Sequence, residues 1–140
     1  MIYIGIDPGV NGGIAWLGNG LTPIAIKMPE TETDILDTLR EIKREGECIA
    51  VLERVHAMPK MGVASMFEFG RGFGALKMAL IACEIPFDLV TPQTWQKAMS
   101  CLTGGDKNVS KRRAQELFPS LKITHAIADS LCIAAYASRR

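Results

Sequence analysis

Apolar and polar residues alternate over the first seven positions of the chain. Ile2, Ile4 and Ile6 lie on one face of this segment, and Asp7 ends the opposite face. A repeat of two residues is the period of a β-strand with one face buried. We therefore expect residues 1–7 to form a strand that ends at Asp7 and is followed by a glycine-rich turn.

The remaining apolar patterns predict four more strands and five helices. Residues 30–44 show the helical pattern, since Ile35, Leu39 and Ile42 recur at three- and four-residue spacing. The segment from Gly18 to Gly20 separates two short apolar runs and is typical of a hairpin turn. The strands are expected over residues 13–17, 23–27, 48–53 and 87–90, and the helices over 30–44, 62–83, from Thr91 onward, 110–118 and 125–138.

The order of these elements predicts the fold class. Three strands in succession can pair as an antiparallel meander, whereas strands reached through helical crossovers add in parallel. We expect a mixed α/β sheet, antiparallel over its first three strands and parallel at the fourth and fifth, with helices on both faces. A chain of 140 residues suits a single domain, residues 1–140.

Composition narrows the class of protein. Hydrophobic residues make up 48% of the chain and charged residues 22%, which is typical of an ordinary folded domain. No apolar run reaches the roughly 18 residues of a membrane helix. The start of the chain also lacks the pattern of a secretory signal, so we expect a cytoplasmic protein with no membrane partner. The four cysteines show no C-x-x-C spacing, which argues against structural zinc and favours reduced, buried thiols.

Charge is distributed unevenly along the chain. Residues 1–90 include 8 basic and 12 acidic residues, a net charge of −4, whereas residues 91–140 include 8 basic and 3 acidic residues, a net charge of +5. A basic half indicates a polyanion as partner. Solvated surface charge explains such an imbalance equally well.

Two carboxylates end predicted strands. Asp7 precedes Pro8 and three glycines, which places a carboxylate beside flexible backbone suited to a metal ion or a phosphate. A local turn hydrogen bond is the alternative. Glu53 ends an apolar strand, where a charge costs free energy unless it is paired or bound to metal. A surface pair with Arg54 is less favoured, because neighbouring strand residues point to opposite faces.

A third carboxylate, Asp129, interrupts the apolar pattern of the last predicted helix. His125 lies four residues earlier on the same face, so the two are candidate metal ligands. An aspartate favoured by the helix dipole is the alternative. Two carboxylates at strand ends and one on a helix form a hard-oxygen set that suits Mg²⁺, with Mn²⁺ as a substitute. Two such ions about 4 Å apart can promote phosphodiester hydrolysis.

Several segments carry a resemblance to a known family. They are Ile-Gly-Ile-Asp-Pro-Gly at residues 4–9, Leu-Glu-Arg-Val at 52–55 and His-x-x-Ala-Asp-Ser-Leu at 125–131. In this order they resemble the RuvC-type Holliday junction resolvases. The stretch from Val55 to Gly70 and Val-Thr-Pro-Gln-Thr-Trp at residues 90–95 look like the short RuvC-like proteins of bacteriophages and prophages.

The resemblance implies a ribonuclease-H-like fold, a homodimer and Mg²⁺- or Mn²⁺-dependent cutting of branched DNA in a bacterial or phage-infected cell. The metal ligands and catalytic residues of that family map onto Asp7, Glu53 and Asp129. Many relatives have a second carboxylate just before the helical aspartate. Here His125 and Thr124 are the candidates, and His125 would bind metal or act as a general acid or base.

DNA contacts are expected from the loop after Glu53 and from the basic half of the chain. In bacterial relatives an aromatic wedge lies near the start of this loop, whereas this chain has a histidine and methionines there. By resemblance, Lys107 matches a lysine near the scissile phosphate. A plain surface loop and a solvated helix face are the alternatives. The expected DNA-binding residues are His56, Met58, Lys60, Lys97, Lys107, Lys111, Arg112 and Arg113.

The predicted helix over residues 62–83 contains Gly70, Gly72 and Gly74. Each glycine costs roughly 1 kcal/mol in a helix, so close packing is expected to compensate. Relatives dimerise through this helix, and we predict a homodimer with twofold symmetry. Tight packing on the chain's own sheet is the alternative.

These observations favour a structure-selective, metal-dependent endonuclease that resolves four-way junctions or other branched DNA and needs no nucleotide cofactor. A less selective nuclease of the ribonuclease H fold and a catalytically silent branched-DNA-binding protein are alternatives. A fragment of a sugar-kinase-like or Hsp70-like ATPase would share the Asp-x-Gly-x-x-Gly pattern at residues 7–12. Such ATPases usually hold the nucleotide between two domains, whereas 140 residues suffice for only one domain, which argues against this class.

Overall fold

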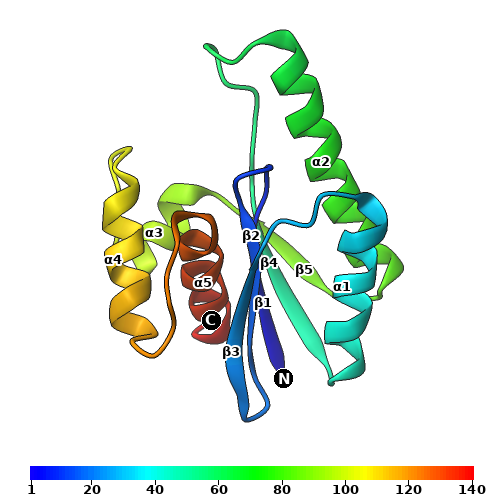
Figure 1. Cartoon of the computed structure of the whole chain (residues 1–140), viewed down its shortest axis with the longest axis vertical. Coiled ribbons are helices and arrows are strands. Elements are labelled where there is room, and N and C mark those ends of the chain that lie inside the picture. Colours follow the sequence, from blue (N-terminus) through cyan, green and yellow to red (C-terminus); the bar gives the residue numbers. More distant parts are fainter.

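Five strands form one mixed sheet in the computed structural model, which describes all 140 residues: β1 (Ile2–Asp7), β2 (Gly13–Gly18), β3 (Leu21–Lys27), β4 (Cys48–Glu53) and β5 (Phe87–Val90). Their order in the sheet is β3-β2-β1-β4-β5 (Figure 1). The first three strands pair antiparallel, and β4 and β5 add in parallel beside β1. The predicted fold class is confirmed.

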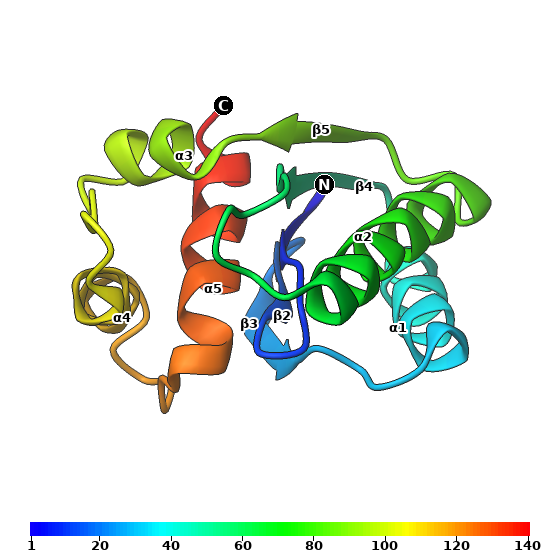
Figure 2. The same ribbon diagram turned by 90° about the horizontal axis from the view of Figure 1, so that it is seen from above.

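Helices cover both faces of this sheet: α1 (Glu32–Arg44), α2 (Val63–Ala82), α3 (Pro92–Ala98), α4 (Lys107–Leu117) and α5 (His125–Ser138). Seen from above, α1 and α2 lie on one side of the sheet and α3, α4 and α5 on the other (Figure 2). None of these helices is both long and apolar enough to cross a membrane.

The hydrophobic core has two parts, one on each face of the sheet. Ile2, Ile4 and Ile6 pack with the buried residues of α1 and α2, as the alternation along β1 predicts. The second part contains Trp95, Leu131 and other residues of α3, α4 and α5. All four cysteines are free; three are buried, and Cys83 is half-buried.

Most element boundaries follow the sequence pattern, with three shifts of two or three residues, at the starts of α4, β3 and α1. The basic helix α4 begins at Lys107 instead of residue 110, because the side chain of Asp106 caps it by accepting a hydrogen bond from the Asn108 amide at 2.9 Å. β3 begins at Leu21 instead of residue 23, since the hairpin turn is tight and Leu21 pairs with Gly18. The helix α1 begins at Glu32 instead of residue 30, because the side chain of Thr31 caps it by accepting a hydrogen bond from the Asp34 amide at 3.0 Å. The shift of α4 places Lys107 at the start of a helix.

Close packing between α5 and the sheet depends on two glycines. A Cβ at Gly5 would lie 2.2 Å from the amide nitrogen of Ala134, and one at Gly13 would lie 2.8 Å from the carbonyl oxygen of Ala126. Real Cβ atoms do not approach other atoms so closely. The backbone of α5 therefore rests directly on β1 and β2, which brings the first turns of the helix to the end of β1.

Candidate active site

Asp7 and Glu53 lie at neighbouring ends of the sheet. β1 and β4 are parallel, and Ile6 is in register with Leu52, so each carboxylate follows a paired residue on adjacent strands. Both side chains are half-buried. The parallel pairing therefore brings together two acidic residues that are 46 positions apart in the sequence.

Asp129 reaches the same place from α5. It is half-buried in the second turn of this helix, which contacts the sheet through Gly5 and Gly13. Its negative charge acts on both strand-end carboxylates. The structure thus places all three predicted carboxylates in one electrostatic cluster.

Burial and mutual repulsion perturb the ionisation of this cluster. Burial is the main cause that raises the pKa of Asp7 well above its usual value, and the charges of Glu53 and Asp129 raise it further. Burial also raises the pKa of Glu53 to about 7, with Asp129 adding to the rise. Such a group of buried acids is stabilised when a cation or a proton neutralises it.

A buried tryptophan orients Glu53. The indole Nε1 of Trp95 donates a hydrogen bond to Oε2 of Glu53 at 2.7 Å, and this bond lowers the pKa of Glu53 against the effect of burial. Trp95 is fully buried in α3, which begins at Pro92 with Thr91 as its cap. Sequence reasoning missed this role; the lone tryptophan in an otherwise polar helix was the only available signal.

Lys107 acts electrostatically on the carboxylate cluster, whereas His125 makes no observed interaction with it. The charge of Lys107 lowers the pKa of Asp7, so the first residue of α4 lies within electrostatic reach of the carboxylates. His125 is exposed at the first position of α5, one turn before Asp129. No hydrogen bond or ion pair of His125 occurs in the structure, and its part in the cluster stays a prediction.

The turn that follows Asp7 is tightly closed. A Cβ at Gly12 would lie 2.0 Å from the carbonyl oxygen of Asp7, so only glycine fits there. The amide of Gly12 donates to the carbonyl of Gly9 at 3.0 Å, and Gly9 has a φ of +106°, which favours glycine. The turn therefore holds the backbone of Asp7 in one conformation.

The donor set fits a hard divalent cation by its chemistry. Three carboxylates supply only oxygen atoms, the ligands that Mg²⁺ and Mn²⁺ prefer, and Lys107 is the one cation whose charge acts on Asp7. The side chains do not form a preassembled cage, since no group of three or more histidine, cysteine or acidic side chains is arranged to hold a metal ion. Asp7, Glu53 and Asp129 are the residues that would hold one.

The loop after Glu53 projects from the same end of the sheet, next to the start of α2 (Figure 1). His56, Met58 and Lys60 are exposed, as expected of residues that contact a large partner. The backbone amide of Met58 donates to the sulfur of Met66 at 3.4 Å, which ties the loop to α2.

The basic residues of α3 and α4 differ in how they are engaged. Lys97 and Arg112 are exposed, and Lys111 is half-buried. Arg113 is held in place, because its Nε donates to the carbonyl of Met99 at 2.8 Å and its Nη1 pairs with Glu116 at 3.2 Å.

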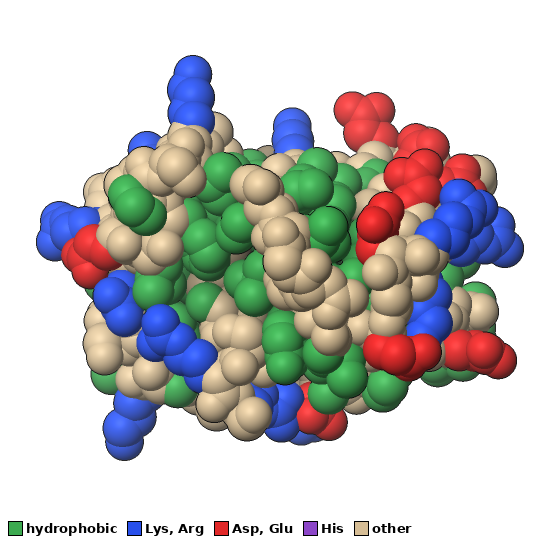
Figure 3. Space-filling model, turned by 90° about the horizontal axis from the view of Figure 1, so that it is seen from below, with side chains coloured by type: hydrophobic (Ala, Val, Ile, Leu, Met, Phe, Trp, Pro, Cys, Tyr) green, Lys and Arg blue, Asp and Glu red, His purple; other side chains and the backbone are tan.

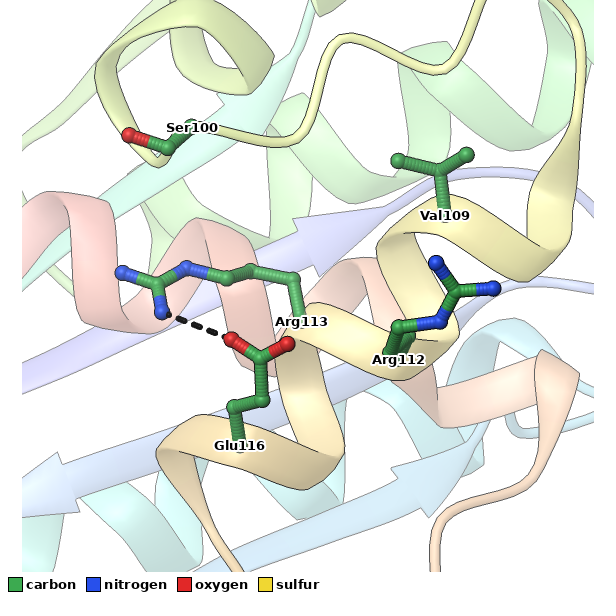
Figure 4. Close-up of a pocket in the computed structure, with 5 residues that line it drawn as sticks. All are labelled: Ser100, Val109, Arg112, Arg113 and Glu116. Atoms are coloured by element: carbon green, nitrogen blue, oxygen red, sulfur yellow. Dashed lines mark hydrogen bonds and ion pairs between the residues drawn. The ribbon is translucent and has the colours of Figure 1, made fainter.

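A shallow pocket of about 340 Å³ lies between the end of α3 and α4. In it, Arg113 reaches toward Glu116 while Arg112 points the other way (Figure 4). The Arg112 side chain makes no hydrogen bond or ion pair within the chain and is available to an anion. The pocket is lined by Ser100, Val109, Arg112, Arg113 and Glu116.

Comparisons with known proteins identify the fold. No protein-family model matches the chain, and no curated protein matches it. The structure of Thermus thermophilus RuvC is similar, with a TM-score of 0.68 and 20% identity over 99% of this chain and 96% of that chain. T. thermophilus RuvC in complex with Holliday junction substrate matches with a TM-score of 0.68 and 18% identity, over 99% and 95% of the two chains.

The yeast mitochondrial Holliday junction resolvase is a more distant neighbour, with a TM-score of 0.48 and 16% identity over 97% of this chain and 77% of that chain. The two RuvC structures cover nearly the whole chain at the higher TM-score. The structural neighbours of this chain are thus RuvC Holliday junction resolvases, and its fold is the RuvC fold.

Proposed function

We propose that the chain is a Mg²⁺-dependent endonuclease that cuts branched DNA and prefers four-way junctions. The observation that carries the proposal is the cluster of Asp7, Glu53 and Asp129, three half-buried acids whose negative charges oppose one another. Such an arrangement is unfavourable in a purely structural role and suits a cation-binding site. The RuvC fold around it supports DNA as the substrate.

The residues of the cluster have separate tasks in this proposal. Asp7, Glu53 and Asp129 hold the divalent ion, which when bound supplies the charge that activates water and stabilises the phosphorane-like transition state. Lys107, whose charge acts on Asp7, would orient the scissile phosphate. His125, exposed at the start of α5, is placed to move a proton at the edge of the site.

DNA backbone contacts extend from the site along the α3–α4 side. Seen from the end opposite the site, acidic side chains gather around α1, whereas the α4 side carries mainly Lys and Arg (Figure 3). Lys97, Lys111 and Arg112 supply positive charge there, and the pocket at Arg112 accepts a phosphate. The loop with His56, Met58 and Lys60 would contact the branch point.

A homodimer through α2 is part of the proposal. Gly70, Gly72 and Gly74 have nothing within 4 Å of a Cβ position, so they do not pack on the chain's own sheet. The alternative of tight packing within one chain is therefore wrong. An exposed apolar stripe runs along α2 at three- and four-residue spacing, through Val63, Phe67, Gly70, Gly74, Met78 and Ile81.

This stripe has the features of a helix–helix interface between two copies. Phe67 is 70% exposed and Val63 88% exposed, which is uncommon for large apolar groups in a row. The glycines at positions 70 and 74 would allow a second helix to approach closely. Two copies related by a twofold axis would present two sites to one junction, which allows paired cuts.

The dimer is tested by mass in solution. We expect light scattering after gel filtration to give twice the 15.3 kDa of one chain. Phe67→Glu should shift the mass toward the monomer, because it places a charge in the interface. Leu102→Glu is the matched control, since Leu102 is 57% exposed in the loop between α3 and α4 and should leave the dimer intact. A wild-type protein of monomer mass would contradict the dimer.

The nuclease activity is tested with an end-labelled four-way junction and a linear duplex of matched sequence. We expect symmetric cuts on the junction with Mg²⁺ or Mn²⁺ and none with a chelator. Asp7→Asn should lower the cleavage rate by more than about 100-fold. Even the loss of a residue that only hydrogen-bonds to a metal ligand typically lowers metal affinity or activity 10- to 100-fold. Asp37→Asn, an exposed carboxylate on α1, is the matched control.

Other outcomes of this assay identify the alternatives. Equal cutting of the linear duplex would replace branch selectivity with a less selective nuclease of the ribonuclease H fold. Tight binding of the junction without cutting in either metal would indicate a silent branched-DNA-binding protein.

A further inference from the structure

The amino-terminal half of α2 extends beyond the sheet and has few supports (Figure 1). Its side chains that turn toward the rest of the chain are only half-buried and recur at helical spacing at Met66, Phe69 and Phe73. The buried residues of the helix all belong to its other half: Leu76, Ala79 and Leu80. The position of the first half therefore depends on a small number of contacts.

Phe69 makes one of these contacts, and it does so with the turn after Asp7. A Cβ at Gly9 would lie 3.2 Å from Cε1 and 3.6 Å from Cδ1 of the Phe69 ring, and no other residue comes within 4 Å of that position. The edge of the ring therefore borders the space that a side chain at position 9 would occupy. Because Gly9 has a φ of +106°, no other residue type would fit this contact easily.

Backbone contacts within the turn connect Gly9 to Asp7. The carbonyl of Gly9 accepts from the Gly12 amide, and Gly12 in turn packs against the carbonyl of Asp7. The amide of Met28 also donates to the carbonyl of Gly12 at 2.9 Å. A displacement at Gly9 is thus passed to the backbone that carries the Asp7 carboxylate.

The opposite face of α2 carries the exposed apolar stripe. The helix therefore has Phe69 against the Asp7 turn on one side and Phe67 directed to solvent on another. We propose that Phe69 is a positioning residue that couples pairing of α2 with a second copy of the chain to the conformation of the turn carrying Asp7. This inference rests on the proposed function, since it assigns the dimer a role in ordering the site.

Hydrogen–deuterium exchange tests the contact without any use of activity. We expect amides of residues 7–13 to exchange about tenfold faster in Phe69→Ala than in wild type, and to a smaller extent in Phe69→Leu, because local opening becomes easier. Phe87→Leu is the matched control, a half-buried phenylalanine of β5 on the same face of the sheet. Unchanged exchange of the turn in a folded Phe69→Ala protein overturns the proposal.

The coupling to the dimer is tested with Phe67→Glu, which leaves Phe69 in place. We expect residues 7–13 to exchange faster in this monomeric variant, whereas Leu102→Glu should match wild type. If the turn is equally protected in the monomer and the dimer, pairing of α2 does not act on Asp7 and the proposal is wrong.

Kinetics on a four-way junction separate positioning from folding. Phe69→Ala should lower kcat by about 10- to 100-fold, as a small displacement of a reacting group does, with KM within about twofold of wild type and the dimer mass unchanged. Phe69→Tyr, which keeps the ring, should restore kcat. A rise in KM of the same size with kcat unchanged would contradict a positioning role. If the wild type cuts no junction, the proposed function fails, and the exchange measurements still decide the coupling.

Discussion

At the scale of single residues, Glu53 is held between two opposing influences. Burial favours its protonated form, and the indole N–H of Trp95 favours the carboxylate. Hydrogen bonds to ligating carboxylates orient them and are worth 10- to 100-fold in metal affinity or activity. The tryptophan therefore does more than fill the core around α3.

We predict that Trp95→Phe lowers the cleavage rate by about 10- to 100-fold and weakens Mg²⁺ binding. The phenylalanine keeps an aromatic ring in the core but cannot donate to Glu53, so the carboxylate loses its fixed orientation. Cleavage rates across a Mg²⁺ titration measure both effects. Trp16→Phe on β2 is the control, because Trp16 packs on the other part of the core and should leave the rate unchanged. Equal losses in both variants would mean that general destabilisation is the cause.

The ionisation of Glu53 predicts how the stability of the metal-free protein depends on pH. Its pKa is raised from the ordinary 4.5 to about 7, so the folded chain keeps a proton that the unfolded chain releases between these values. The stabilisation is fully present below pH 4.5 and is lost as the pH rises through about 7. We expect Glu53→Gln to lose less stability than wild type between pH 5 and pH 8.

Urea unfolding at the two pH values measures this difference. The comparison with Glu53→Gln removes the contribution of other acids, such as Glu32, whose lowered pKa acts in the opposite direction. Mg²⁺ at pH 8 should stabilise the wild type and have a smaller effect on the variant, since binding to the folded state raises its stability. Parallel pH curves for the two proteins would show that Glu53 is not buried as described.

At the scale of elements, the site depends on how closely α5 approaches β1. We predict that Gly5→Ala destabilises the chain by about 1–3 kcal/mol or more, as overpacking of a core does. Its Cβ would collide with backbone atoms of Ser130 and Ala134, so α5 must move and Asp129 with it. Gly62→Ala is the control, because a Cβ at Gly62 meets nothing within 4 Å. The free energy of unfolding, measured in urea, and the cleavage rate should both fall in Gly5→Ala and stay at the wild-type values in Gly62→Ala.

The elements also show how far a sequence can predict this site. The alternation of apolar and polar residues predicted that the first strand ends at Asp7, and the apolar run before Glu53 predicted the end of the fourth strand. Because both strands are parallel, their ends meet, and the placement of these carboxylates followed from the pattern. Asp129 was found as the charged interruption of an apolar helix.

Other parts of the site could not be read from the sequence, because they depend on contacts between distant positions. Trp95 and Glu53 are 42 residues apart, and their hydrogen bond exists only once α3 lies on the sheet. The requirement for glycine at position 5 likewise arises from Ala134, far along the chain. Asp106 as the cap of α4 was a local signal that was open to sequence reasoning and was missed.

At the scale of the whole molecule, the α4 side carries mainly Lys and Arg, whereas acidic side chains gather among basic ones around α1, so a polyanion should approach from the α4 side (Figure 3). DNA binding through phosphates releases counterions, and the affinity therefore falls with salt by a slope set by the number of contacts. We predict that Arg112→Ala reduces the slope of log Kd against log salt for a four-way junction by about 1. Arg112 is exposed and its side chain makes no hydrogen bond or ion pair within the chain, so it is free to contact a phosphate.

The measurement uses the Asp7→Asn background, in which the proposed function predicts binding of the junction with little cutting. Arg40→Ala is the matched control, because Arg40 is equally basic but pairs with Asp37 at 3.7 Å on α1, away from the α4 side (Figure 2). Its slope should equal that of the parent protein. If both variants reduce the slope alike, the DNA responds to net charge and not to the α4 side. If neither does, the basic half of the chain is a solvated surface, and the DNA must be held by the loop after Glu53.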